Sequence, residues 1–397
     1  MLEAKYGLPP TVMFCKRCVI SNQRPSSVSE YRNVGQDKPT IHFDEEGVCD
    51  ACRTAERKGA IDWGERERLL RELCDRFRDR TRPYDCVAPG SGGKDSFYAA
   101  HVLKTRFDMR PLTVTWRPHL YTAWGFANHA RWIDAGFDNY LVSPNGKIHR
   151  LLTRLAVENL FHPFQPFIIG QKGLAPKLAA QFGIPLVFFG EDEAEYGNPI
   201  QDSQTPTRDA SYHTSDDVHL SGVSLRDLRS QYGLTLGDLE PYIPASAEKL
   251  SGVEVHYLGY YLKWGPQECY YYAQEHGGFE SAPERSPGSY SRYNSIDDKL
   301  DDLHYWTTYQ KFGIGRATYD AAQEIRNAHL TREDGVALVK RFDGEYPERF
   351  EREVFDYLSV DGFVPFTRER LFMLAEKFRS PHLWDGDTLR YRVWDSE

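Results

Sequence analysis

Between Tyr84 and Gly190 the chain alternates short apolar runs with longer stretches in which apolar residues recur every three or four positions. The short runs have the length of buried strands and span residues 85–87, 112–116, 140–142 and 184–189. The longer stretches have helical spacing and span about 95–106, 125–136, 146–160 and 171–182. This alternation predicts an α/β fold, a doubly wound parallel sheet whose ligands bind beyond the carboxyl ends of the strands.

Three further regions follow other patterns. Residues 1–60 are loop-rich with only short apolar pieces, which predicts a module with little core of its own. Residues 191 to about 250 are polar and punctuated by glycine and proline, so we expect a functional loop or lid there. Beyond residue 295 the spacing predicts a C-terminal helical region, with helices near 315–328, 331–342, 347–358 and 367–378. We therefore place domain boundaries at residues 60 and 270.

A glycine-rich stretch, Ala88 to Ser96, lies where the first strand meets the first helix. Backbone amides and the helix dipole favour an anion at such a turn. A Walker loop would need glycine at Ala88 and serine or threonine at Asp95, and a dinucleotide fingerprint from Gly90 would need glycine at Asp95. The remaining pattern, Ser-Gly-Gly-x-Asp-Ser, resembles the pyrophosphate loop of the adenylating PP-loop family.

The resemblance to PP-loop enzymes implies a mechanism and a cofactor set. Such enzymes hold the β,γ-pyrophosphate of ATP while a substrate oxygen attacks the α-phosphorus, and a nucleophile then displaces AMP. Asp95 is implied to help place Mg²⁺ and so to act in catalysis. The positions implied to hold the pyrophosphate are Ser91, Gly92, Gly93, Lys94, Asp95 and Ser96. The alternative is a tight glycine-rich turn without a ligand.

Two cysteine pairs stand near the N-terminus, Cys15 with Cys18 and Cys49 with Cys52. A two-residue spacer lets both thiolates of a pair bind one tetrahedral ion, so the pattern predicts a four-cysteine zinc site of structural character. Reduced thiols or a redox pair remain the alternative. The isolated cysteines are interpreted as packed thiols; they are Cys74, Cys86 and Cys269.

Charged residues elsewhere supply further candidates for the active site. Glu191 and Asp192 follow the last predicted strand, where they could hold Mg²⁺ or orient a substrate, or could be part of a solvated loop. Lys172 is expected to open a helix near the crevice and to neutralise phosphate. Lys311 and Arg316 flank a glycine turn, and either contact nucleotide phosphate or cap an ordinary connection between helices.

The sequence Ser295-Ile-Asp-Asp298 is interpreted as a variant capping box that opens a helix. Aspartates follow it closely, and negative charge is favourable in the first turns of a helix. Their predicted role is therefore to stabilise the helix rather than to bind a ligand; these residues are Asp297, Asp298, Asp301 and Asp302.

Composition and charge narrow the possible partners. A net charge of -9 disfavours a protein whose main partner is nucleic acid. The chain has no apolar run near the roughly 18 residues of a membrane span, and its start lacks the apolar stretch of a signal peptide, so we expect a cytoplasmic location. Sulfur transfer is disfavoured because residues 87–268 contain no cysteine. Ammonia is the stronger alternative nucleophile, but no glutaminase motif is present, so it must come from a partner or from solution.

Taken together, the motifs resemble bacterial N-acetyl sugar amidotransferases of surface-polysaccharide (lipopolysaccharide) synthesis, over residues 13 to 380. The motifs that carry the resemblance are the two cysteine pairs, the pyrophosphate loop, Gly190-Glu191-Asp192, the stretch from Ser295 to Asp302, and the stretch from Lys311 to Arg316.

The resemblance implies that ATP activates the N-acetyl amide of a nucleotide-linked sugar and that ammonia replaces the oxygen. It also implies a separate glutaminase partner, similar to the ammonia-producing part of imidazole-glycerol-phosphate synthase. The three predicted parts are then a zinc-binding module (1–60), an ATP-binding domain (61–270) and a helical region (271–397). A tRNA-thiolating enzyme and a non-catalytic nucleotide-binding zinc scaffold remain as alternatives.

Overall fold

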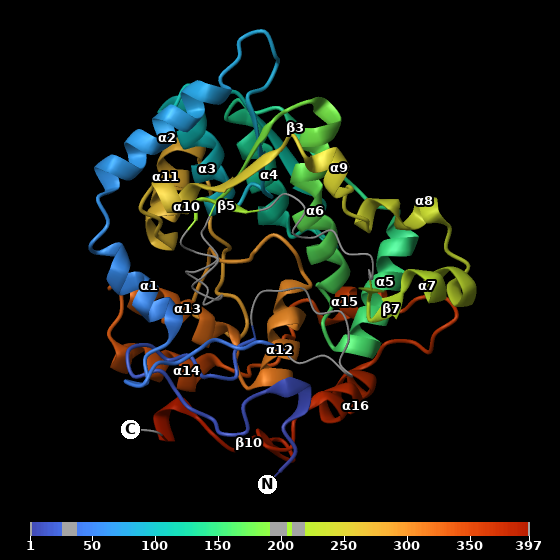
Figure 1. The fold of residues 1–397 in the computed structure, drawn as a ribbon. Helices are drawn as coiled ribbons and strands as arrows, with labels where there is room; N and C mark the ends of the chain where they lie inside the picture. Colours follow the sequence, from blue (N-terminus) through green and yellow to red (C-terminus); the bar gives the residue numbers. More distant parts are fainter. Residues whose placement is uncertain (1, 26–37, 191–204, 209–218, 396–397) are drawn as a thin grey trace.

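The computed structural model describes residues 2–25, 38–190, 205–208 and 219–395 (Figure 1). Its central sheet has the strand order β3-β2-β1-β4-β8-β5 within these residues. All neighbouring strands are parallel except β5, which pairs antiparallel with β8. The strands are β1 (Cys86–Pro89), β2 (Pro111–Trp116), β3 (Asn139–Val142), β4 (Leu186–Phe189), β5 (Thr207–Arg208) and β8 (Glu254–Tyr257).

Helices cover both faces of the sheet, because successive strand residues point to opposite sides. In β1, Cys86 and Ala88 pack among residues of α2 (Trp63–Phe77), α3 (Lys94–Thr105), α4 (Ala123–Asp134) and α11 (Pro266–Gly277). Val87, between them, packs among residues of α5 (Gly146–Leu160) and α6 (Gln165–Phe182). The predicted doubly wound α/β fold is confirmed.

The chain turns back across the sheet after β3, and β4 joins the other side of β1. Such a reversal leaves a crevice at the carboxyl ends of the two adjacent strands, and ligands of open α/β sheets bind there. The glycine-rich stretch directly follows β1, so the fold brings the predicted phosphate loop to this crevice.

Three expectations about the sheet and its connections need correction. β3 exists, but it forms an edge and leaves Tyr140 and Leu141 exposed, so its predicted burial is wrong. β8 was not predicted, because only Val255 among its four residues is an aliphatic strand former. The described part of the predicted 191–250 loop is folded: it contains β5, a hairpin of β6 (His219–Leu220) and β7 (Val223–Ser224), and four short helices. Of these, α7 (Leu225–Tyr232), α8 (Leu236–Leu239) and η4 (Glu240–Tyr242) contribute apolar residues to the core.

The C-terminal region is helical, as predicted, with its helices close to the expected spans. These are α12 (Asp301–Phe312), α13 (Arg316–Arg326), α14 (Arg332–Phe342), α15 (Glu351–Leu358) and α16 (Arg368–Phe378). The first predicted boundary lies between α1 (Asp50–Lys58) and α2, whereas residue 270 lies inside α11, which packs on α3. Among the described residues, no helix combines the length and apolarity needed to cross a membrane.

The N-terminal segment packs on the C-terminal helices (Figure 1). Ile20 and Val48 share an apolar cluster with Ala321 of α13 and Val336 of α14. The main-chain amide of His382 donates to the Glu3 carbonyl at 3.1 Å. The module around the cysteine pairs therefore has no core separate from the helical region.

The remaining short elements complete the chain. They are η1 (Lys5–Gly7), β6 (His219–Leu220), β7 (Val223–Ser224), α7 (Leu225–Tyr232), α8 (Leu236–Leu239), η4 (Glu240–Tyr242), α9 (Ala247–Leu250), α10 (Leu258–Tyr261), β9 (Trp384–Asp385), β10 (Thr388–Leu389) and η5 (Val393–Asp395).

Candidate active site and metal centre

The glycine-rich loop has a backbone shape that other residues would not reproduce. Gly92 has φ of +85°, in the left-handed region that favours glycine. A Cβ at Gly92 would stand 2.7 Å from the Cα of His129 in α4, and one at Gly90 would stand 2.1 Å from the Cβ of Ser96. Both glycines are thus needed for α3 and α4 to lie this close to the loop.

Helix α3 begins at Lys94, directly after the loop, with Gly93 as its N-cap. No side chain caps the helix, so its first amides and the positive end of its dipole are directed at the crevice. The Ser96 hydroxyl donates to the Gly93 carbonyl at 2.9 Å and holds the turn in place. These features fit an anion such as pyrophosphate.

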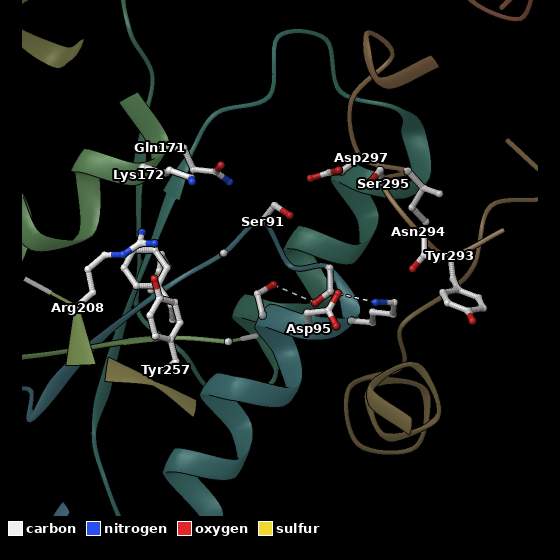
Figure 2. A pocket seen from close by; sticks show the side chains of 18 residues that line it. Ser91, Asp95, Gln171, Lys172, Arg208, Tyr257, Tyr293, Asn294, Ser295 and Asp297 are labelled. Atoms are coloured by element: carbon white, nitrogen blue, oxygen red, sulfur yellow. Dashed lines mark hydrogen bonds and ion pairs between the residues drawn. The ribbon is translucent and has the colours of Figure 1, made fainter. Parts of the chain in front are cut away.

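A pocket of about 470 Å³ opens at the carboxyl ends of β1, β4 and β8. Figure 2 shows Ser91 and Asp95 in its middle, between two walls. Lys172 and Gln171 of α6, with Arg208 of β5 and Tyr257 of β8, form one wall, and residues 293–297 form the other. The pocket thus unites the predicted loop with parts of the chain far away in sequence.

The cations of this pocket suit a polyphosphate. Lys94, Lys172 and Arg208 all line it, and the Lys94 ammonium pairs with the Asp95 carboxylate. Lys172 lies inside α6, which begins at Gln165, so the expectation that it opens a helix is wrong. The helix begins earlier because Pro166 occupies its N-terminal turn, where proline is tolerated. Gln171, Arg208 and Tyr257 were not predicted as site residues.

Asp297 is the pocket residue that the sequence pattern misassigned. Helix α12 begins only at Asp301 and has no side-chain cap, and Ser295 has φ of +43°, so the predicted capping box is wrong. Asp297 lines the pocket opposite Lys172 (Figure 2). Burial raises the pKa of Asp297. The only signal was the Ser-Ile-Asp-Asp motif, whose spacing also suits a helix cap.

The next residue, Asp298, anchors this wall to the sheet. Its carboxylate accepts from the main-chain amides of His119, at 2.6 Å, and Leu300, at 3.0 Å, and contacts His119 Nδ1 at 2.7 Å. The Thr122 amide also donates to the Asp297 carbonyl, at 3.0 Å. The segment is therefore tied to the β2–α4 connection rather than to a helix end.

Lys311 and Arg316 lie outside the pocket. The Lys311 ammonium is buried, donates to the Leu160 carbonyl at 2.7 Å and stands 4.6 Å from the centre of the Tyr6 ring. Arg316 is buried beneath the pocket wall, where it donates to the carbonyls of Asn294 and Ser295. Gly313 between them has φ of +69° and ends α12, the geometry of an ordinary helix connection.

Glu191 and Asp192 lie outside the described residues, although Gly190 before them lines the pocket. All seven cysteines are buried, and none lines this pocket among the described residues. Cys86 lies within β1, where burial raises the pKa of its thiol. The site thus offers no nucleophilic thiolate to a bound nucleotide.

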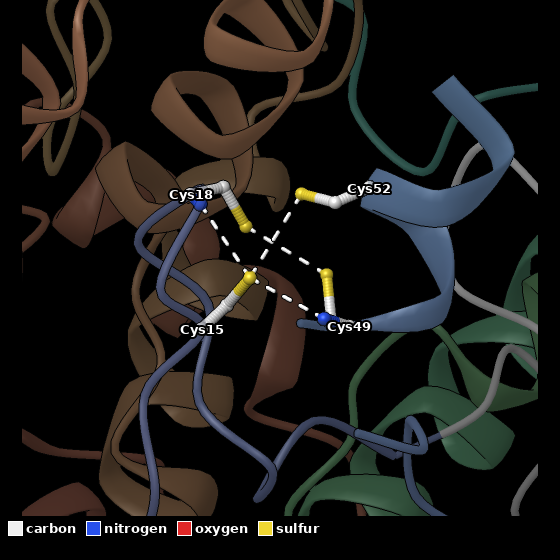
Figure 3. Close-up of side chains that lie close together, drawn as sticks. All are labelled: Cys15, Cys18, Cys49 and Cys52. Atoms are coloured by element: carbon white, nitrogen blue, oxygen red, sulfur yellow. Dashed lines mark hydrogen bonds between the residues drawn. The ribbon is translucent and has the colours of Figure 1, made fainter. Parts of the chain in front are cut away.

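The four N-terminal cysteines form one buried cluster (Figure 3). Their sulfurs all lie within 4.8 Å of one another, with Cys15 Sγ 3.9 Å from Cys52 Sγ and Cys18 Sγ 3.8 Å from Cys49 Sγ. The main-chain amides of Arg17 and Cys49 donate to Cys15 Sγ, each at 3.4 Å. The neighbouring thiol of Cys18, followed by those of Cys49 and Cys52, lowers the pKa of Cys15. The cluster is suited to hold a metal, as the spacing predicts.

Comparison with known proteins gives a family for the end of the chain. Residues 287–395 match the family described as "LPS biosynthesis protein WbpG-like, C-terminal domain", which confirms, for this part of the chain, the resemblance to proteins of lipopolysaccharide biosynthesis. No curated protein matches the chain.

Among solved structures, the U34-tRNA thiolase NcsA from Methanococcus maripaludis, with its 4Fe-4S cluster, is similar at 11% identity and a TM-score of 0.28. The alignment covers 90% of this chain and 99% of that one. A likeness this low carries no argument about activity.

Proposed function

We propose, from the WbpG-like domain that ends this chain, an ATP-dependent amidotransferase that converts the N-acetyl group of a nucleotide-linked sugar into an acetamidino group. The main support for this function is the set of residues that line one pocket. Its floor is the phosphate loop, and its second wall, Tyr293 to Asp297, belongs to the part of the chain that matches a lipopolysaccharide biosynthesis family.

The reaction needs two displacements, and ATP supplies an adenylyl group for the first. The amide oxygen attacks the α-phosphorus, the bond to the bridging oxygen breaks, and pyrophosphate leaves. Ammonia then adds to the activated carbon, the carbon–oxygen bond breaks, AMP leaves and a proton is lost. An amide is a poor electrophile, and attachment of the adenylyl group turns its oxygen into part of a leaving group, AMP. Overall, one oxygen is exchanged for one NH group.

The residues of the pocket have distinct roles in this scheme. The loop amides after Gly90 hold the departing pyrophosphate, and Lys94, Lys172 and Arg208 balance its charge. Asp95 and Asp297 are the carboxylates that would hold Mg²⁺, which takes one or two carboxylates beside substrate phosphates. Charge that develops on the bridging oxygen is thus met by groups already in position.

For the cysteine cluster we propose a single zinc ion with a structural role. Four thiolates at about 2.3 Å from one ion at the centre of a tetrahedron stand about 3.8 Å apart, close to the 3.8 and 3.9 Å observed. Sulfurs that bind separate irons of a cluster must stand farther apart. All four ligand positions are protein thiols, so no position remains for a substrate.

We further propose that ammonia comes from a separate glutaminase. Among the described residues, no cysteine that could hydrolyse glutamine lines the pocket, which supports a source of ammonia in another protein. Ammonium salt at high concentration should replace the partner in vitro.

The test is a turnover assay with a panel of nucleotide-linked N-acetyl hexosamines, Mg²⁺-ATP and ammonium. We expect AMP and pyrophosphate in equal amounts and a sugar whose mass reflects exchange of oxygen for NH. A heavy-oxygen label in the N-acetyl carbonyl should appear in the phosphate of AMP. ADP release, AMP formation without sugar, or label retained in the sugar would contradict the proposal.

A matched pair of variants connects the reaction to the pocket. Asp95→Asn removes a carboxylate that lines the pocket, whereas Asp134→Asn makes the same change at the exposed end of α4. We expect turnover to be lost in the first and kept in the second, with equal zinc content in both. Equal turnover would remove Asp95 from its assigned role.

A further inference from the structure

A second cavity, of about 350 Å³, lies behind the wall that residues 293 and 294 form for the nucleotide pocket. Tyr293 and Asn294 line both cavities. The volume falls in the range of small-molecule sites. A group bound in this cavity would thus lie next to the nucleotide pocket, with Tyr293 and Asn294 between the two.

The lining of this second cavity combines carboxylates, cations and aromatic rings. Asp320 and Glu324, one helical turn apart on α13, line it together with Arg292, His329 and several tyrosines. A carboxylate accepts hydrogen bonds and a guanidinium donates them. Acceptors and donors thus stand beside aromatic faces, a lining that suits a hydroxyl-rich ring such as a pyranose.

The acidic groups are held in fixed positions. Glu324 Oε1 accepts from the Tyr293 hydroxyl at 3.0 Å, and Asp320 Oδ1 accepts from Asn294 Nδ2 at 3.2 Å. The Tyr293 ring also stacks on the Tyr270 ring, with centroids 4.4 Å apart. Each carboxylate oxygen can accept a second hydrogen bond, so this network leaves acceptors for hydroxyl groups of a ligand.

We propose that this cavity binds the pyranose of the sugar substrate and directs its N-acetyl group past Asn294 toward the phosphate loop. The assignment rests on the proposed function and names the acceptor subsite within it. Most of the lining, including Tyr290, Asp320 and Glu324, lies in the stretch that matches the lipopolysaccharide biosynthesis family, whereas the phosphate loop does not. Sugar recognition and nucleotide activation thus use opposite sides of one segment.

The test fills the cavity from a position that does not line the nucleotide pocket. Gln267 of α11 lines the second cavity only, and Gln274, two turns later on the same helix, is exposed. We expect Gln267→Trp to raise the KM for the sugar by about tenfold or more, because the indole would occupy space that the sugar needs, with the KM for ATP unchanged. Gln274→Trp should change neither value. Glu324→Gln, which removes the charge at nearly constant size, should also raise only the KM for the sugar.

The possible outcomes distinguish failure of the proposed sugar site from failure of the proposed reaction. Turnover with an unchanged KM for the sugar in Gln267→Trp overturns the assignment and leaves the proposed function intact. A selective rise in the KM for ammonium would assign the cavity to ammonium instead. If no sugar turns over, sugar binding is measured by calorimetry with UDP-N-acetylglucosamine and the rest of the panel. If a sugar binds to the native chain but not to Gln267→Trp, the sugar site stands and the proposed reaction is refuted. If no sugar binds to the native chain, both are refuted.

Discussion

The phosphate loop should not tolerate a methyl group at Gly92. In Gly92→Ala the left-handed φ of +85° costs about 1–2 kcal/mol. The new Cβ would also stand 2.7 Å from the Cα of His129 and 3.0 Å from the Asn128 carbonyl oxygen, an overlap that costs about 1–3 kcal/mol. Because the contacts are backbone atoms of a helix, the loop rather than α4 has to move.

The two costs add to about 2–5 kcal/mol, which at about 1.4 kcal/mol per tenfold corresponds to ATP binding weakened about 30-fold to several thousand-fold. Gly183→Ala is the matched control, since Gly183 has φ of +66° but nothing within 4 Å of its Cβ position. We expect the control to lose about 1–2 kcal/mol of stability in urea unfolding and no ATP affinity in calorimetry. Equal ATP affinity of Gly92→Ala and the native chain would refute the assignment of the loop as a phosphate site.

Three further predictions concern the acid in the pocket wall, the metal and the thiols. Because burial raises the pKa of Asp297, its charged form costs stability at neutral pH, and this cost disappears as pH falls through the raised pKa. The variant Asp297→Asn should therefore melt at a higher temperature at neutral pH and lose most of its turnover. Its pH–rate profile should also lack the acid limb of the native profile, and an unchanged profile would contradict this. Cys49→Ser should lose zinc, measured by elemental analysis, and melt at a lower temperature, since binding energy of a structural metal is folding energy, whereas Cys269→Ser should keep the metal. Cys86→Ala should keep AMP formation; a folded variant without turnover would favour sulfur transfer.

Local patterns predicted the parts of this protein that depend on neighbouring residues in sequence. The strand, glycine loop and helix around Ser91 follow from the spacing of apolar residues and from the backbone freedom of glycine. The two-residue spacer within each cysteine pair is enough to predict the metal site. The C-terminal helices follow from the 3.6-residue period. In each of these cases the local preference and the tertiary environment favour the same structure.

The sequence pattern was insufficient to predict the structure where segments that are distant in sequence come into contact. Asp297 has the spacing of a helix cap, but the hydrogen bonds between Asp298 and the His119 region hold the segment in a non-helical path past the pocket. Arg208 reaches the site because a two-residue strand pairs with β8, a contact with no signal in either stretch alone. The position of Lys311 depends on the Leu160 carbonyl, which is far away in sequence.

Helix α13 lies between the cysteine cluster and the second cavity and presents a different face to each. Ala321 and Ala322 pack in the apolar cluster that contains the metal-site cysteines, and Asp320 and Glu324 line the second cavity. A fragment that starts at residue 61 would expose the apolar underside of α13 and α14 to water, and would aggregate rather than report on nucleotide binding. The part of this protein that contains the two cavities therefore depends on the cysteine segment for its packing, and the two have to be kept together in any shortened version of the chain.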